Sequence, residues 1–292
     1  MKSQELRKFE SKLKDINDQL CYFLFSDTEI NRVFSEIKEN TSEFFTTDVF
    51  PKNEFSGRLH IKIDALPQFR TKAFHTLVSM SVIASVEYLL NYIEEIEIFR
   101  SKVIPSEHDL IKNQKPEEQV KEKLKHWLKK EPENELIKTI SYLRLRRNHI
   151  AHVEENMNEA FRTLVKNDSN NLNKYWSTHA IKLNSFDFSS TSHSEFKAND
   201  IFALINLSRV CMRKIDEMVL STVHEENIVR YILPTFLSNK KLNGLKLNVK
   251  ARKFNAFLQQ QFGKKMECAN SLLKDYLENS SQCKNSYHLS RK

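Results

Sequence analysis

Glycine is scarce in this chain of 292 residues, which contains only Gly57, Gly244 and Gly263. A GxGxxG dinucleotide loop and a GxxxxGK[ST] phosphate loop each need closely spaced glycines, so neither motif can be written in this sequence. Tight hairpin turns also favour glycine, because it reaches positive φ at little steric cost. Since prolines are few as well, with 6 in all, we expect an all-α fold of long antiparallel helices.

The composition is that of a globular protein with a sizeable core, with 40% hydrophobic and 29% charged residues. The cysteines are scattered and form no CxxC pair, which argues against a zinc ribbon or a disulfide framework. A reduced, cytoplasmic setting is therefore expected. The first ten residues lack the apolar core of a secretion signal. The most apolar stretch, Leu77 to Val86, is too short to span a bilayer, so no membrane association is expected.

Charge is distributed unevenly along the chain. Residues 235–292 hold 12 Lys and Arg against 3 Asp and Glu, a net charge of +9, whereas residues 1–234 hold 34 basic and 35 acidic residues. We therefore expect a helical domain over 1–234 and a basic C-terminal extension over 235–292. Such an extension indicates an anionic partner, with RNA as the first candidate, although a basic tail that only aids solubility fits the same charges.

Apolar residues recur at three- and four-residue steps through most of the first 234 residues. This pattern predicts helices over 4–25, 28–40, 69–100, 117–130, 133–152, and from a cap near Ser194 to Val219. Proline, glycine and polar residues predict connections between these helices. We expect a loop over 46–68 with a short extended piece near Leu59 to Ile63, a connection over 101–118, and a polar insertion over about 153–194. Pro234 is expected to end the body.

The segment with the clearest chemical potential runs from Arg144 to His152 and reads RLRRNHIAH. Arg147 is followed by Asn148 and, after three more residues, by His152, an Arg-x4-His pattern near the end of an amphipathic helix. On a helix Arg147 and His152 point about 140° apart, so they do not form an i, i+4 pair. Arg144, Asn148 and His152 instead lie along one slowly turning ridge.

At these residues the chain resembles the HEPN family (higher eukaryotes and prokaryotes nucleotide-binding domains). The resemblance covers most of residues 1–230: a leading helix, an apolar helix that contains SVEYLL, and then RNHIAH. It implies a helical bundle and a metal-independent endoribonuclease with no cofactor, which acts as a homodimer. It also implies a toxin or phage-defence role with a neutralising partner. Val153 and Glu154 depart from the glycine and tyrosine that many relatives carry there.

The resemblance assigns roles to three residues of the motif. His152 acts as general base or acid while a ribose 2′-OH attacks phosphorus, Arg147 stabilises the phosphorane, and Asn148 orients His152 or the phosphate. The expected products carry a 2′,3′-cyclic phosphate and a 5′-OH. The residue types suit this chemistry, because a guanidinium binds phosphate bidentately and an imidazole exchanges protons near neutral pH.

Glu87 lies in the middle of the most apolar helix, where a carboxylate needs a cation or hydrogen-bond donors. We expect it to support the site by anchoring Arg147 or another arginine at the groove, with Arg144 as a further supporting residue, although an outward-facing surface glutamate is the alternative. The sequence is also consistent with a Glu87–Arg147 pair that has no catalytic purpose. His152 could likewise be a histidine that the helix dipole favours at a C-terminal end.

The basic extension offers phosphate contacts through five residues: Lys250, Arg252, Lys253, Lys264 and Lys265. The interleaved phenylalanines, Phe254, Phe257 and Phe262, are expected in the core rather than stacked on bases. Two other function classes remain open. One is a catalytically inactive helical module that binds RNA or a protein, and the other is a metal nuclease. For the latter, His149 and His152 are suitably close, but no third ligand is evident.

Overall fold

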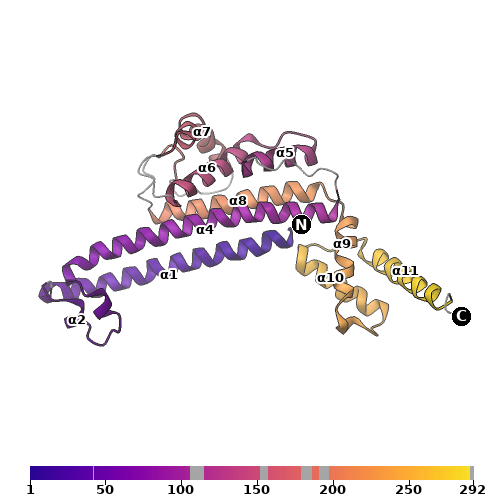
Figure 1. The fold of residues 1–292 in the computed structure, drawn as a ribbon, viewed down its shortest axis with the longest axis horizontal. Coiled ribbons are helices and arrows are strands. Elements are labelled where there is room, and N and C mark those ends of the chain that lie inside the picture. The colour runs from indigo at the N-terminus through magenta and orange to yellow at the C-terminus, as the bar shows by residue number, and fades with distance from the viewer. Residues whose placement is uncertain (42, 106–114, 152–156, 179–185, 191–196, 290–292) are drawn as a thin grey trace. The chain divides into compact units, whose positions relative to one another are not determined.

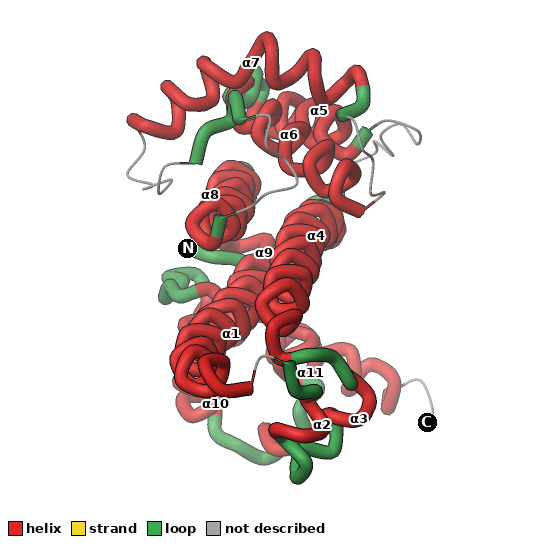
Figure 2. Tube along the Cα trace, turned by 90° about the vertical axis from the view of Figure 1, so that its left-hand side faces the viewer, coloured by secondary structure: helices red, strands yellow, loops and turns green. Residues whose placement is uncertain are grey.

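The computed structural model of the chain describes residues 1–41, 43–105, 115–151, 157–178, 186–190 and 197–289. Within these ranges the regular elements are helical, apart from one isolated bridge between Phe45 and Lys62 (Figures 1 and 2). The predicted all-α class is therefore confirmed for the described part of the chain.

The helices follow one another with short connections. Their bounds are α1 Gln4–Thr41, α2 Thr46–Val49, α3 Ser56–Leu59, η1 Ile63–Ala65, α4 Leu66–Val103, α5 Pro116–Leu128, α6 Asn134–Ala151, α7 Glu159–Thr178, α8 Ala198–Ser221, α9 Glu225–Leu237, η2 Lys240–Leu242, α10 Leu247–Phe262 and α11 Ala269–Leu289. The prediction of long helices is confirmed most clearly by α4, which contains the whole of the expected 69–100 helix.

The chain divides into two compact units. The first unit comprises Met1–Glu10, Leu89–Ile137 and Val210–Lys292, and the second comprises Ser11–Tyr88 and Lys138–Arg209. Helices α1, α4, α6 and α8 contribute residues to both. The structure thus groups the basic extension with the first residues of the chain and the second half of α4, not as a unit of its own.

The predicted break between residues 25 and 28 is wrong, because α1 continues without interruption to Thr41. Ser26 and Asp27 look like a helix start, but Asp27 pairs with Arg70 of α4 instead of capping a new helix. In the second unit α1 and α4 run side by side in opposite directions (Figure 1), with the rings of Phe23 and Phe74 stacked 6.2 Å apart. Contacts between helices therefore override a local capping tendency.

The expected polar insertion over about 153–194 is not simply a connecting loop in its described part. Residues 159–178 form α7, a helix of 20 residues that buries one apolar face: Phe161, Leu164, Val165, Leu172 and Trp176. In the asparagine-rich run, Asn167, Asn170 and Asn171 are exposed. The Trp176 indole donates a hydrogen bond of 2.9 Å to Thr139 Oγ1 of α6, which ties α7 to the helix that carries the motif.

Two proline positions correct the predicted connections. α5 begins at Pro116, inside the expected 101–118 connection, and proline suits the first helical turn because its missing N–H has no partner there. Pro234 does not end the body, since it lies inside α9. Proline cannot donate to the Arg230 carbonyl one turn earlier, and Arg230 is an exposed residue of this helix.

The expected loop over 46–68 is more ordered than predicted, since it contains α2, α3 and η1. The extended piece is present in short form. The Thr46 amide donates to the Ile61 carbonyl at 2.9 Å, and the Ile63 amide donates to the Phe44 carbonyl at 3.0 Å. The predicted cap at Ser194 lies outside the described residues.

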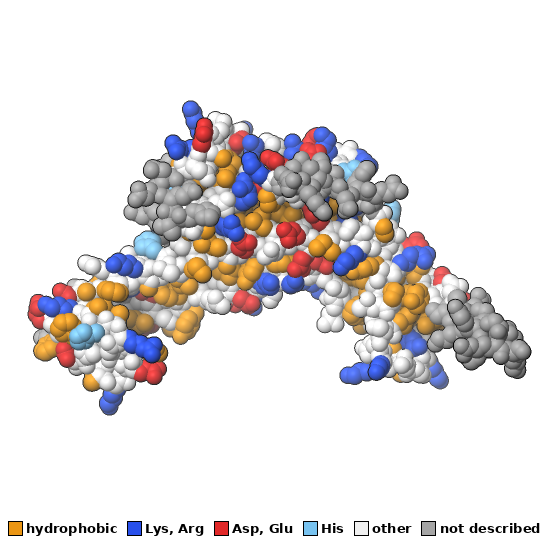
Figure 3. Space-filling view, in the orientation of Figure 1, with side chains coloured by type: hydrophobic (Ala, Val, Ile, Leu, Met, Phe, Trp, Pro, Cys, Tyr) orange, Lys and Arg blue, Asp and Glu red, His pale blue; other side chains and the backbone are white. Residues whose placement is uncertain are grey.

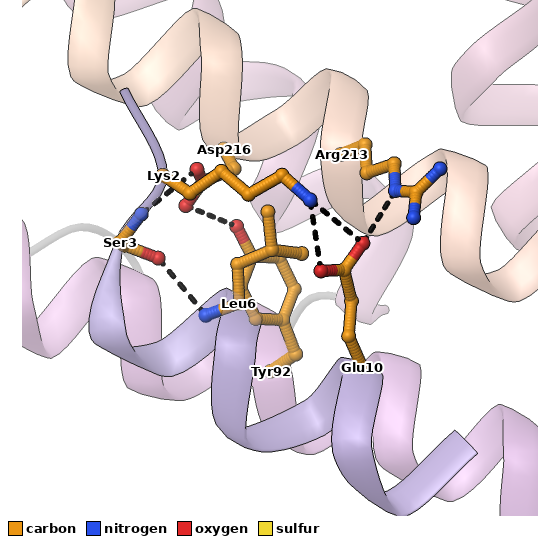
Figure 4. Close-up of polar contacts among 7 residues, drawn as sticks. All are labelled: Lys2, Ser3, Leu6, Glu10, Tyr92, Arg213 and Asp216. Carbon is orange, nitrogen blue, oxygen red and sulfur yellow. Dashed lines mark hydrogen bonds and ion pairs between the residues drawn. The ribbon is translucent and has the colours of Figure 1, made fainter. Parts of the chain in front are cut away.

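A buried carboxylate fixes the start of the chain in the first unit (Figure 4). Asp216 of α8 accepts hydrogen bonds from the backbone amide of Ser3 and from the Tyr92 hydroxyl, both at 3.1 Å. Ser3 Oγ in turn accepts from the Leu6 amide at 2.9 Å and so caps α1. Burial raises the pKa of Asp216 and raises that of Tyr92 well above its usual range.

Replacing Tyr92 with phenylalanine should destabilise the fold, because Asp216 then loses one of its buried donors. We expect Tyr92→Phe to lower the free energy of unfolding by about 1–3 kcal/mol in urea titrations. Tyr22→Phe is the matched control, since the Tyr22 side chain is exposed.

The loss of unfolding free energy caused by Tyr92→Phe should grow with pH. The folded pKa of Asp216 is raised, so its stabilising contribution is present at low pH and is lost as pH rises through that pKa. The Tyr92 hydroxyl lowers the pKa of Asp216, and removing it raises this pKa further. A deficit that shrinks between pH 4 and pH 8 would contradict the assignment.

Candidate functional site

Arg147 marks the place where the buried stripe of α6 emerges at the surface. The stripe begins with Leu136, Ile140 and Leu143, none of which is exposed to solvent. One turn later comes Arg147, whose side chain is 29% exposed. The spacing that buries the apolar residues therefore carries the guanidinium to the edge of the core, where it remains accessible.

Glu87 of α4 holds this guanidinium. Nη2 of Arg147 forms an ion pair with Oε1 of Glu87, and Nη1 of Arg147 donates a hydrogen bond of 2.8 Å to Oδ1 of Asn148. The Glu87 side chain is 32% exposed, so it is neither sealed in the core nor on an outer face. The expected pairing of Glu87 with Arg147 is confirmed, and both Nη atoms are oriented.

Arg146, the residue before Arg147, has a different environment that the sequence did not reveal. It is only 2% exposed, and its Nε donates to the Tyr142 hydroxyl at 2.9 Å. Its guanidinium carbon lies 5.2–5.9 Å from the ring centres of Tyr142, Phe161 and Phe186. Arg146 is therefore a buried cation among aromatic rings, and Arg147 is the arginine of the two that reaches solvent.

The other predicted residues of the motif are placed only in part. His152 lies outside the described residues, which end at Ala151 on this side. Arg144 is half-buried on α6, one turn before Asn148. His149 is buried, with its ring 6.2 Å from that of Phe161, and so faces the core. In the described ranges no three His, Cys, Asp or Glu residues are grouped to hold a metal ion.

The basic extension comprises the last three residues of α9 followed by η2, α10 and α11, and it belongs to the first unit. Phe254 and Phe262 are fully buried and Phe257 is half-buried, which confirms that these rings belong mainly to the core. Arg252, Lys253 and Lys265 are exposed, Lys250 is half-buried, and Lys264 pairs with Glu225. Three of the five residues predicted to contact phosphates are thus exposed to solvent.

One described segment, Ile63–Val103, is long and apolar enough to cross a membrane by length and composition alone. Its most apolar window has a mean hydropathy of 1.4, and 33% of that window is buried. A core helix meets the same criterion, and this segment carries the ion-paired Glu87 near its centre. The criterion is therefore weak evidence for membrane insertion.

Comparisons with known proteins return no counterpart: no family model, no curated protein and no solved structure matches the chain. Function therefore has to be argued from the residues themselves.

A double-mutant cycle measures how far the Glu87–Arg147 pair is structural. Because both side chains are about one-third exposed, we expect a coupling free energy of roughly 0.5–1 kcal/mol between Glu87→Gln and Arg147→Gln in urea unfolding. The more exposed pair Glu226–Arg230 of α9, at i and i+4, serves as the reference cycle and should couple by about 0.3–0.5 kcal/mol. A coupling free energy several times larger for Glu87–Arg147 would indicate that the pair serves mainly to stabilise the fold.

Proposed function

We propose that the protein is a metal-independent endoribonuclease of the HEPN kind. The observation that carries the proposal is the Arg147 guanidinium, on a side chain that is 29% exposed, oriented by Glu87 and Asn148 near the end of α6, five residues before His152. An arginine held in this way is preorganised to receive charge that develops on a bound phosphate.

The number of hydrogen-bond donors on Arg147 suits a phosphate ligand. A guanidinium carries five N–H groups, of which Glu87 engages one on Nη2 and Asn148 one on Nη1. The second hydrogen of each Nη atom remains for the two oxygens of a phosphodiester. Glu87 also offsets part of the positive charge, so an anion binds through directed hydrogen bonds as well as through Coulomb attraction.

The proposed reaction is an internal transfer of the phosphodiester. The imidazole of His152 removes the proton of the ribose 2′-OH, the 2′-oxygen forms a bond to phosphorus, and the bond from phosphorus to the 5′-oxygen breaks. The proton returned by an imidazole neutralises the departing 5′-oxygen. Arg147 stabilises the extra negative charge of the phosphorane. The products are a 2′,3′-cyclic phosphate and a 5′-OH.

Partners follow from the same proposal. RNA is the substrate at the motif, the exposed basic residues of the extension are separate candidates for phosphate contacts, and the active form is a homodimer. The biological role is that of a cytoplasmic toxin or phage-defence effector, restrained by a neutralising protein.

A second candidate is a catalytically inactive helical module that binds RNA or a protein partner. The observation that favours it is the same ion pair, because a guanidinium already engaged by Glu87 also serves simply to satisfy a carboxylate on an apolar helix. The two candidates differ in one measurable property, the making of new RNA ends.

Cleavage of RNA in the presence of EDTA tests the proposal. We expect purified protein to cut total RNA in excess chelator and to leave 5′-OH ends. Arg147→Ala and His152→Ala should each slow cleavage by at least about 100-fold, because removing one electrostatic or acid–base group typically costs that much. Arg230→Ala, an exposed arginine on α9, is the matched control and should cut normally.

The outcomes separate the candidates clearly. RNA that stays intact at high protein concentration, with all variants folded by circular dichroism, supports the inactive module. Activity that disappears in EDTA and returns with a divalent cation supports a metal nuclease instead.

The exposed cations of α10 should govern the salt dependence of RNA binding. In an Arg147→Ala background that does not cut, Arg252→Ala with Lys253→Ala removes two phosphate contacts. The slope of log affinity against log salt for a single-stranded RNA should then fall by about 1.4. Lys102→Ala with Lys130→Ala, also exposed, is the control pair and should leave the slope unchanged. Equal slopes for all three proteins would remove α10 from the RNA interface.

A further inference from the structure

We infer that two adjoining apolar cavities beside α1, α3 and the beginning of α4 bind an amphiphilic anion, a molecule with one long aliphatic chain and a carboxylate or phosphate head. The inference goes beyond the proposed function, because the residues involved are separate from the Arg147 motif and take no part in RNA cleavage. All of them belong to the second unit.

The first cavity is lined by the second half of α1, by α3 and η1, and by the first turns of α4, and it has a volume of about 650 Å³. Sites for small molecules usually measure about 300–1,000 Å³. The walls consist mainly of large apolar side chains: Phe23, Ile30, Phe34, Leu59, Ile63 and Phe69. A lining of this kind suits a hydrocarbon chain, because each methylene group that enters it leaves water.

The charged groups of the first cavity already satisfy each other. Nε and Nη2 of Arg70 donate to the two carboxylate oxygens of Asp27, the second of them at 2.6 Å. The Ser35 hydroxyl donates to the Arg32 carbonyl at 2.8 Å. Ser26 and Asn31, which also line the cavity, carry no charge. The apolar part of a ligand therefore fits here without leaving a charge unpaired.

The second cavity adjoins the first and has a volume of about 450 Å³. The two share Phe34, Leu59 and Leu66, so only these side chains stand between them. The ring of Phe34 meets that of Phe50, a wall of the second cavity, edge to face at 5.8 Å. A compact ligand fills one compartment, whereas a long flexible chain extends from one into the other.

Most polar side chains of the second cavity hold the surrounding backbone. Thr46 Oγ1 donates to the Ser56 carbonyl at 3.1 Å, and Ser56 Oγ donates to the Asn53 carbonyl at 2.8 Å. Oδ1 of Asn53 accepts from the Phe55 amide at 2.9 Å. Since these hydrogen bonds fix the loop, Arg58 is the charged group of this lining that a ligand can meet.

The charge of the second cavity is complementary to an anion. Arg58 is exposed, and no ion pair joins it to an acid among the described residues. A more open hollow next to it shares Phe50 and Asn53 with the second cavity and adds Lys52. Among the described residues that line the three hollows, Asp27 is the only acid, and Arg70 already holds it. An anionic head is therefore expected beside Arg58.

Exposed apolar side chains surround the cavities. Ile30 is 48% exposed, Phe55 59% and Phe69 42%. Figure 3 shows hydrophobic side chains on the surface around α2 and the adjoining ends of α1 and α4, with Lys and Arg side chains among them. A chain that fills both cavities removes part of this apolar surface from water, and a head at the surface keeps its own hydration.

Calorimetric titration of the full chain with simple amphiphiles tests the ligand class. In the series octanoate, decanoate and laurate, each added methylene group should tighten binding about fourfold while the cavities have room. Laurate and dodecyl phosphate should both bind more tightly than dodecanol, and dodecyltrimethylammonium should bind most weakly. Whichever of the two anions binds more tightly identifies the head group.

A charge placed in the wall tests the site. Ile30→Glu should weaken laurate binding by at least about tenfold, because it sets a carboxylate inside the apolar lining and repels the head. Val33→Glu is the matched control, since Val33 is also exposed on α1 but does not line a cavity, and it should bind normally. Circular dichroism and the unfolding midpoint check that both variants fold.

The head contact has its own test. Arg58→Gln should weaken laurate binding about two- to fivefold, as expected for an exposed ion pair, and leave dodecanol binding unchanged. Arg230→Gln, an exposed arginine in the other unit, is the control. In the native chain, laurate should also slow amide hydrogen exchange in peptides from 22–35 and 56–73 and leave α10 unchanged.

Three results would overturn the inference. The first is a native chain that binds no laurate at 100 µM, and the second is laurate binding that Ile30→Glu leaves intact. The third is dodecyltrimethylammonium binding as tight as that of laurate. None of these measurements reads RNA cleavage, so a chain that binds laurate and cuts no RNA removes the proposed nuclease alone.

Discussion

The ion pair between Glu87 and Arg147 is the constraint on which the rest of the site depends. A carboxylate in the middle of a long apolar helix needs a cation or hydrogen-bond donors, and α6 supplies a cation at the end of its buried stripe. The pair fixes which face of α6 turns towards α4. Arg146 completes this choice, because its guanidinium is buried among aromatic rings on another side of the same helix. Arg146 is therefore buried, whereas the adjacent Arg147 is accessible to a ligand.

This arrangement also explains why the pair alone does not decide between catalysis and structure. An ion pair whose side chains are about one-third exposed contributes little to stability, because solvent screens it and both side chains lose conformational freedom. Its main effect is orientation. An oriented guanidinium is useful to a phosphate, but it also satisfies a carboxylate in a protein that never meets RNA. The chemical difference lies in the imidazole of His152, because only a group that exchanges protons near neutral pH turns an anion site into a nuclease.

Much of the fold was predictable because its helices are long and strongly periodic. The whole of the expected 69–100 helix lies within α4, and the expected Glu87–Arg147 pair is present. Local signals failed where distant contacts outweighed them. Asp27 is a good cap in isolation but pairs with Arg70, and the asparagine-rich part of α7 is held in a helix by Phe161 and Trp176 on its buried face. The burial of Arg146 could not be foreseen, since no local pattern distinguishes it from Arg147.

The beginning of α4 is more exposed than its central turns. Most of the long helices bury a stripe, and the central turns of α4 bury Val78, Val82 and Val86 completely. Residues 67–73 depart from this pattern, although they belong to the same helix and include Phe69. An apolar side chain gains stability only when something removes it from water. Phe69, Ala73, Met80 and Glu87 lie on one face of α4, so a molecule that covered this face would also lie close to the Arg147 guanidinium that Glu87 orients.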